Sequence, residues 1–205
     1  YGVPEMRERV IFIGIRKDAL KPEVLKALSS QQVPREYDPY PIPTHSATVK
    51  GSNLLGIVTT KDVLEGLKEP EKTIDASQQL YSKAKFLATG QGQTEIKLDN
   101  LGPTIRSEHH GNIEFRRLSL EHGGKHFDEL NAGLQERRLT PRECALIQTF
   151  PPDYRFVMKK TSGHGYRLSS SGAYKVIGNA VPPVLAFNIA MRLQEVWDEY
   201  FLPTE

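Results

Sequence analysis

Residues 169–192, SSSGAYKVIGNAVPPVLAFNIAMR, are the stretch around which the rest of the chain can be interpreted. The pattern predicts a short helix over 172–177, with Ser171 as its N-cap and Gly178 as the residue that leaves it with a positive φ. Pro182 and Pro183 then fit the first turn of a second helix, where a missing N–H costs nothing. Apolar residues recur at helical spacing in that second helix, so we expect one face to be buried: Leu185, Ile189, Leu193, Val196 and Trp197. On this pattern alone, two helices that close a hydrophobic core are the simplest interpretation.

Three stretches of the chain carry a more specific signal. AYKVIGNAVPP at 173–183 resembles the tenth and last motif of the DNA cytosine-5 methyltransferases. RRLTPRECA at 137–145, running on to Phe150 and Pro151, resembles the ninth motif of that family, and YGVPEMRER at 1–9 resembles the eighth. The three matches stand in the family's order, with a long variable stretch between the first and the second. The resemblance covers the whole chain, but only the C-terminal part of such an enzyme.

Composition sets broad limits on the protein. The chain has 205 residues, 27 Lys and Arg against 25 Asp and Glu, and one cysteine, so any basic surface must be local and no internal disulfide can form. No uninterrupted run of about 18 apolar residues and no signal peptide is present. We therefore expect a soluble, cytoplasmic protein with no membrane partner. Because the chain opens at Tyr1 within a motif, we also expect a piece of a longer polypeptide.

The remaining patterns predict a mixed α/β fragment. The almost continuous apolar run RVIFIGIR at 9–16 is typical of a strand covered on both faces, whose sheet would lie mostly on residues outside this chain. Helices are predicted within 18–32, from Thr59 onward, over 75–87 and from Thr140 to about Phe150, and short strands over 94–98, 104–106 and 112–118. Thr140, Pro141 and Glu143 form a capping-box pattern.

The resemblance adds an architecture to these elements. It implies part of a Rossmann-like methyltransferase sheet, a small loop-rich target-recognition domain and C-terminal helices. Residues 1–33 would then end the catalytic-lobe sheet, 34–136 would form the DNA-binding domain with its linker, and 137–205 would return to the N-terminal catalytic lobe.

The resemblance also implies an activity and two groups of site residues. Arg9 would donate to O2 of a cytosine flipped out of double-stranded DNA, and Arg7 would hold a phosphate or the active-site loop; a forked, permanently charged guanidinium suits both tasks. Asn179, Ala180 and Val181 would border the pocket of the cofactor S-adenosylmethionine. Glu5 stands where the family usually has Gln. In such enzymes a cysteine thiolate attacks C6 of the cytosine and C5 takes the methyl group, but the sequences that match that cysteine and the main cofactor loop are absent from this chain.

The middle of the chain corresponds by position to the target-recognition region. Arginine suits guanine or phosphate, and glutamine suits adenine. The side chains of this kind that we expect to contact DNA are Arg106, Arg116, Arg117, Gln91 and Gln93. For any single one of them, an ordinary surface position is the simpler interpretation.

Other candidate chemistry is weaker. His109, His110, His122 and His126 lie close in sequence, but Gly-Gly between the last two argues against one helical face and no CxxC completes a ligand set, so we expect no metal. Cys144 lies within an apolar helix, which predicts an inert buried thiol.

Two hypotheses therefore stand side by side. The chain is the C-terminal portion of a DNA cytosine-5 methyltransferase, whose catalytic lobe lies on the same or a separate polypeptide. Alternatively, it is a non-catalytic DNA-recognition subunit of a split methyltransferase. An inactive relative is a third and weaker possibility, for which Glu5 is the only indication.

Overall fold

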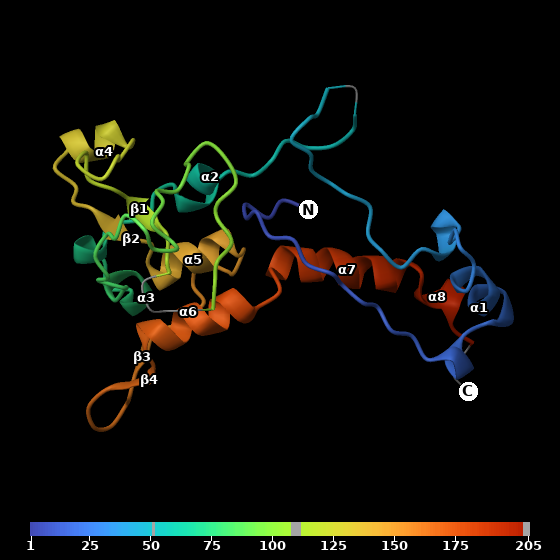
Figure 1. Cartoon of the computed structure of the whole chain (residues 1–205). Helices are drawn as coiled ribbons and strands as arrows, with labels where there is room; N and C mark the ends of the chain where they lie inside the picture. The colour runs from blue at the N-terminus through green and yellow to red at the C-terminus, as the bar shows by residue number, and fades with distance from the viewer. Residues whose placement is uncertain (51, 108–111, 203–205) are drawn as a thin grey trace. The chain divides into compact units, whose positions relative to one another are not determined.

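In the computed structural model, the described residues are 1–50, 52–107 and 112–202, and they form two units (Figure 1). We call Val3–Arg7 with Ile57–Pro182 the central unit, and Tyr1–Gly2, Glu8–Gly56 and Pro183–Glu205 the terminal unit. The helices and strands of the central unit are α2 (Thr60–Leu64), η3 (Pro70–Lys72), α3 (Ala76–Gln79), β1 (Phe115–Arg117), α4 (Phe127–Asn131), β2 (Arg137–Arg138), α5 (Pro141–Ile147), β3 (Met158–Lys159), β4 (Tyr166–Leu168) and α6 (Ser170–Asn179). Those of the terminal unit are η1 (Lys17–Ala19), α1 (Pro22–Leu28), η2 (Arg35–Tyr37), α7 (Pro183–Glu195) and α8 (Trp197–Tyr200).

The short helix α5 lies at the centre of the central unit. Its predicted capping box is confirmed: the Thr140 hydroxyl accepts from the Glu143 N–H at 3.0 Å, and Glu143 Oε2 accepts from the Thr140 N–H at 2.9 Å. The helix ends at Ile147, earlier than predicted, and Thr149 has a φ of 68°. It contacts α2, α3 and α6. Its side chains Cys144, Ala145 and Ile147 are completely buried and form the middle of the hydrophobic core.

Two small antiparallel sheets border this core. In the first, Phe115 of β1 pairs with Arg138 of β2, and in the second, Met158 of β3 pairs with Leu168 of β4. The second sheet is a hairpin that leads directly into α6, and its loop reaches away from α5 and α6 in Figure 1. The chain is thus a mixture of helices and small antiparallel sheets, consistent with a fragment of an α/β protein.

The helix α6 corrects two details of the prediction. Ser169, not Ser171, is its N-cap, because the Ser169 hydroxyl accepts from the Gly172 N–H at 3.2 Å. Gly178 lies inside the helix without a positive φ. Its lack of a side chain has another reason: a Cβ there would lie 2.5 Å from the Arg106 carbonyl oxygen, so only glycine lets α6 approach this backbone so closely.

In the terminal unit, α8 and Val196 just before it share a small core with α1 and Leu20. Leu20, Val24, Val196 and Tyr200 are buried together. The Arg192 guanidinium donates to backbone carbonyls around η2, including that of Asp38 at 2.9 Å. The predicted burial of one helical face is realised only in part. Val196, just after α7, is buried, whereas Leu185, Ile189 and Leu193 are half-buried and the Trp197 side chain is 57 % exposed.

Residues 9–16 do not form the predicted strand. The run is irregular, and its side chains Val10 and Phe12 are 80 % and 90 % exposed. A strand needs a neighbour to accept and donate its backbone hydrogen bonds, and the described part of the chain provides none here. The predicted strand over 94–98 is reduced to one bridge between Glu95 and Phe115, the one over 104–106 is absent, and the helix over 75–87 is reduced to α3.

One stretch of the described residues, Ser170–Glu195, has the length and mean hydropathy of a membrane span. The chain breaks it into α6 of 10 residues and α7 of 13, separated by Ala180, Val181 and Pro182. Neither helix approaches the roughly 20 residues that a span requires. The stretch is therefore weak support for contact with a membrane.

Candidate functional site

Arg7 joins three distant parts of the central unit. Its Nη2 donates to the Gly178 carbonyl at 2.8 Å, and its Nη1 donates to the Ile105 carbonyl at 3.0 Å. The segment before it is fixed as well, because Pro4 and Met6 exchange backbone hydrogen bonds with Gly102 at 2.8 and 2.9 Å. The Arg7 side chain is 11 % exposed. It thus ties the start of the chain to the C-terminal end of α6.

The turn after α6 is held in place by the buried side chain of Gln148. Gln148 Nε2 donates to the Ile177 carbonyl at 2.9 Å and lies 3.5 Å from the Ala180 carbonyl. Asn179 is exposed, Ala180 is half-buried and the Val181 side chain is 57 % exposed. The predicted cofactor-binding residues therefore form a turn with a fixed inner side and an open outer side.

Arg9 lies only two residues from Arg7 but differs from it in exposure and in hydrogen-bond partners. It is exposed, and its Nη1 donates to the carbonyl of the neighbouring Glu8 at 2.6 Å. It belongs to the terminal unit, whereas Arg7 belongs to the central unit. One arginine of the predicted pair is thus held by the fold, and the other is available to a ligand.

We expect Arg7→Lys to lower the free energy of unfolding by about 1.5 kcal/mol, because one ammonium group cannot reproduce a fork across two carbonyls. Arg9→Lys is the matched control and is expected to leave stability unchanged within about 0.5 kcal/mol. Urea unfolding followed by circular dichroism measures both. Equal stabilities of the two variants would contradict the anchoring role of Arg7.

The residues predicted to contact DNA have different surroundings. The Arg106 side chain is 37 % exposed and lies 3.6 Å from Glu114 Oε1. Gln91 is exposed, and its carbonyl accepts from Gln93 Nε2 at 2.9 Å. Gln93 Oε1 in turn accepts from the Leu87 N–H, so its amide is partly used to shape the loop.

Arg116 and Arg117 belong to a buried network of ion pairs. The Arg117 side chain is 1 % exposed and donates to Glu69 and Glu129 at 2.6 Å each. The Arg116 side chain is 11 % exposed and pairs with Glu129. This geometry gives both arginines a structural role, and nothing in it supports the DNA contact predicted for them.

The sequence did not predict this network or the buried arginine beside it. Glu69 also accepts from Arg137 at 2.9 Å, and Arg137 makes a two-fold contact with Glu143 at 2.8 Å. Arg138 lies 3.7 Å over the Phe115 ring and donates to the carbonyls of Ala84, Lys85, Gly92 and Ile113. The adjacent arginines at 137–138, directly before the capping-box helix, are the sequence feature that could have indicated this network. A buried arginine needs several hydrogen-bond acceptors, so two of them next to a helix predict buried polar partners.

The histidine cluster does not assemble within the described residues. His109 and His110 lie outside them. His122 Nδ1 lies 2.6 Å from Glu136 Oε2, and His126 Nε2 lies 3.0 Å from the Ile96 carbonyl. Among residues 1–50, 52–107 and 112–202, no three His, Cys, Asp or Glu side chains are grouped as metal ligands.

Cys144 is the free thiol predicted to be buried. It is completely buried, and burial raises the pKa of the thiol well above its ordinary value, with the nearby Glu143 carboxylate adding to the shift. A thiol held neutral in this way is a poor nucleophile. It is a core residue.

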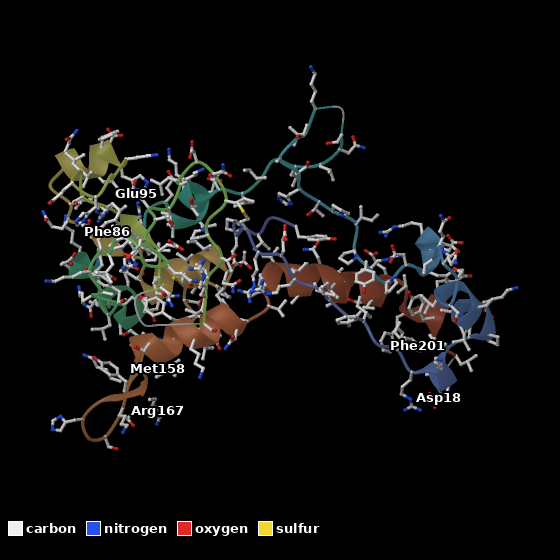
Figure 2. All side chains as sticks on the ribbon, in the orientation of Figure 1. Asp18, Phe86, Glu95, Met158, Arg167 and Phe201 are labelled. Carbon is white, nitrogen blue, oxygen red and sulfur yellow. The ribbon has the colours of Figure 1, made fainter. Side chains whose placement is uncertain are left out.

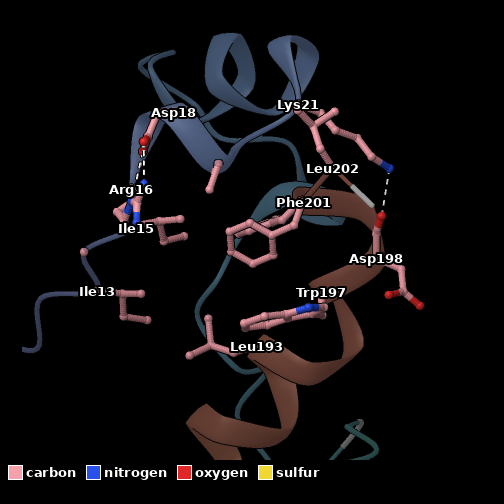
Figure 3. Close-up of a pocket in the computed structure, with 13 residues that line it drawn as sticks. Ile13, Ile15, Arg16, Asp18, Lys21, Leu193, Trp197, Asp198, Phe201 and Leu202 are labelled. Carbon is pink, nitrogen blue, oxygen red and sulfur yellow. Dashed lines mark hydrogen bonds and ion pairs between the residues drawn. The ribbon is translucent and has the colours of Figure 1, made fainter. Parts of the chain in front are cut away.

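The terminal unit contains an apolar cavity of about 970 Å³ (Figure 3). Figure 3 shows the rings of Trp197 and Phe201 facing the cavity together with Leu193, Ile13 and Ile15. Along α7, the Phe187 side chain is 63 % exposed. The terminal unit thus presents an apolar cavity and exposed apolar side chains, a kind of surface that can mark an interaction site.

Comparison with known proteins defines the class to which these features belong. The family model for C-5 cytosine-specific DNA methylase matches residues 1–195, and the chain belongs to this family. Methyltransferase activity on cytosine is therefore the chemistry of its class.

The chain is similar to several individual methyltransferases. It is 28 % identical to the Type II methyltransferase M.DdeI of Desulfomicrobium norvegicum, over 94 % of this chain and 51 % of that protein. It is 26 % identical to the Type II methyltransferase M.NgoPII of Neisseria gonorrhoeae, over 95 % of this chain and 52 % of that protein. A stretch of 64 residues is 42 % identical to DNA (cytosine-5)-methyltransferase 1B of rice, Oryza sativa subsp. japonica, which covers 31 % of this chain and 4 % of that protein. The chain spans about half the length of the bacterial relatives that it matches along most of its length.

Proposed function

We propose that this chain is the C-terminal, target-recognising portion of a DNA cytosine-5 methyltransferase. The observation that supports this most directly is the Arg7 fork on Gly178 and Ile105. It joins the segment expected to lead to the flipped cytosine, the segment that carries the predicted DNA contact Arg106, and the helix that ends at the predicted cofactor turn. Three parts of one predicted site, 171 residues apart at the extremes, therefore converge on one side chain.

In this proposal Arg9 provides the ligand contact. Its exposed guanidinium can donate to O2 of a flipped cytosine, and its charge does not depend on pH in the physiological range. Arg7 positions the segment and does not touch the base. The division of labour explains why one arginine is buried and the other exposed.

The turn of Asn179, Ala180 and Val181 fits an edge of an S-adenosylmethionine pocket. An exposed amide suits the polar groups of the cofactor, and the exposed Val181 side chain suits an apolar part of it. The cofactor would supply the methyl group. Gln148 keeps the backbone of the turn in place from the core side.

Recognition of double-stranded DNA is assigned to Arg106 and Gln91, supported by Gln93. The Arg106 side chain is 37 % exposed, although its Nη1 is buried beside Glu114, and Gln91 is exposed. These side-chain types read guanine and adenine edges in the major groove. The protein would act in the cytoplasm, where its DNA is.

The partner of the terminal unit would be the N-terminal catalytic lobe. The apolar cavity of Figure 3 and the exposed Phe12 and Phe187 provide the surface for this lobe. The lobe would contribute the nucleophilic cysteine, the main cofactor loop and the Rossmann-like sheet. On the same or a separate polypeptide, it would complete the site.

Methyl transfer from labelled S-adenosylmethionine to mixed-sequence DNA tests the proposal. We expect activity from this chain together with the polypeptide encoded immediately upstream, and a loss of at least about 100-fold in Arg9→Ala, the size of one lost transition-state contact. The control Lys26→Ala removes an exposed cation of α1 that does not line the cavity of Figure 3, and it is expected to retain activity. DNA binding without methyl transfer would favour the non-catalytic recognition subunit, and absence of both would overturn either assignment.

A further inference from the structure

The β3–β4 hairpin and its flanks are a basic ribbon. Between Pro151 and Ser169 the sequence has Arg155, Lys159, Lys160 and Arg167 against the single acid Asp153, and all four cations are exposed. Met158 and Arg167, labelled in Figure 2, lie on the two strands of the hairpin. The Lys160 N–H donates to the Gly165 carbonyl at 3.1 Å and closes the loop. None of the predicted DNA contacts lies on this ribbon.

A cavity of about 630 Å³ lies at the base of the ribbon. Arg155, Lys159 and Arg167 line it from the hairpin and its flank, and Arg142 lines it from α5. The carboxylates in its lining are Asp75 and Asp153, and Asp75 is already paired, because Arg142 Nε donates to its Oδ2 at 2.6 Å. Four cations against two carboxylates leave the cavity electropositive.

Arg142 provides an independent indication of a ligand. Its side chain is 4 % exposed, and its Nη1 is a buried donor without a hydrogen-bond partner among the described residues. Buried polar atoms in native proteins almost always have a partner, and an unpaired donor on a charged group is costly. A guanidinium with a spare donor in a basic cavity is suited to an anion with several acceptor oxygens, above all phosphate.

We propose that the basic ribbon and its cavity bind the phosphate backbone of duplex DNA, outside the surface that reads the bases. This inference rests on the proposed function, which makes DNA the substrate. A chain of phosphates is favoured over a single free anion because the cations continue beyond the cavity: Lys160 does not line it and stands further along the hairpin. Contacts to phosphates position a protein on DNA without reading the sequence.

The test compares two triple variants in the presence of the upstream polypeptide. The first removes three charges from the ribbon, Lys159→Gln, Lys160→Gln and Arg167→Gln. The matched control removes three exposed charges outside the ribbon and outside residues 34–136, Lys17→Gln, Lys26→Gln and Lys175→Gln. All six side chains are exposed, so both variants should fold, and circular dichroism checks this. The dissociation constant for a mixed-sequence duplex is measured between about 50 and about 200 mM salt.

The ribbon variant is expected to bind DNA at least about tenfold more weakly at the low-salt end. The slope of the logarithm of the binding constant against the logarithm of the salt concentration should become shallower by about 2 to 3, because each lost phosphate contact contributes about 0.9 to it. The control is expected to keep the parent slope. Equal binding by the ribbon variant and the parent, or an equal loss in the control, would overturn the proposal. Stabilisation of the parent by inorganic phosphate at matched ionic strength, with unchanged DNA affinity in the ribbon variant, would assign the cavity to a free anion and also overturn it.

Methyl transfer at saturating DNA, measured with the same preparations, separates this inference from the proposed function. A parent preparation that binds DNA but transfers no methyl group refutes the enzyme assignment while the ribbon can still be tested. A parent that transfers methyl groups, with a ribbon variant that binds DNA equally well, refutes only the ribbon.

Discussion

Gly178→Ala is expected to lower the free energy of unfolding by about 2 kcal/mol, although alanine is the better helix former. A Cβ at this position would lie 2.5 Å from the Arg106 carbonyl oxygen and 2.6 Å from the Ser107 nitrogen. These are backbone atoms, so the collision cannot be relieved by rotating a side chain. Overpacking of this kind costs up to about 3 kcal/mol, and the helix-propensity gain of about 1 kcal/mol offsets only part of it.

The same substitution has a functional consequence. The Gly178 carbonyl accepts from Arg7 Nη2, so any shift of α6 away from Arg106 also loosens the anchor at the start of the chain. For a chain of this length, a loss of 2 kcal/mol corresponds to a melting temperature lower by about 4 to 8 °C. Differential scanning calorimetry of the chain with its upstream polypeptide measures this shift.

Gly172→Ala is the matched control on the same helix. A Cβ there would lie 2.6 Å from Leu168 Cδ1, which is the end of a flexible, half-buried side chain. Leu168 can change rotamer, and the gain in helix propensity offsets the adjustment. We expect a melting temperature within about 2 °C of the parent. If both alanine variants melt alike, close packing on the Arg106 backbone is not the reason for glycine at position 178.

The elements that sequence predicts well here are those specified by neighbouring residues. The capping box of α5 needs only Thr140 and Glu143, three positions apart, and both of its hydrogen bonds form. The helix over 172–177 is found inside α6, with its start displaced by two residues because Ser169 and Ser171 are equally good caps in isolation. The apolar run at 9–16 depends on a sheet partner, and its hydrogen bonds cannot form without one. An apolar run indicates that a segment can form a strand, but whether the strand forms depends on partner strands elsewhere in the chain.

The candidate site divides in the same way. The sequence places Arg7 and Arg9 in one motif. It does not indicate which of the two is exposed, because the burial of Arg7 depends on carbonyls that lie 98 and 171 residues away along the chain. It likewise treats Arg117 as a surface charge, because its partner Glu69 is 48 positions away. Residue type indicates what a side chain can bind, and only the fold determines whether its donors are already used.

Glu69→Gln is expected to lower the free energy of unfolding by about 3 kcal/mol, the lower end of the range for breaking a buried pair, because the Glu69 side chain is 20 % exposed. Its carboxylate accepts from both Arg117 and Arg137, whose side chains are 1 % and 5 % exposed. An amide is isosteric but neutral, so it leaves two nearly buried guanidinium groups with less compensation. The control Glu71→Gln changes an exposed carboxylate in the same turn of η3 and is expected to alter stability by less than about 0.5 kcal/mol.

The pH dependence separates the charge of Glu69 from its shape. Burial by itself would raise the pKa of Glu69, but hydrogen bonds and charge from Arg137 and Arg117 outweigh it and hold the pKa below its ordinary value of 4.5. A carboxylate whose pKa is lower in the folded state contributes stability above its unfolded pKa and loses it as the pH falls through the folded value. The parent should therefore lose stability as the pH falls below about 4.5. The Glu69→Gln variant should lose less, because it has no titrating group at position 69. Urea midpoints from pH 7 to 3 measure both. If the difference between parent and Glu69→Gln stays constant over that range, the network acts through packing, and the two arginines do not depend on the Glu69 charge.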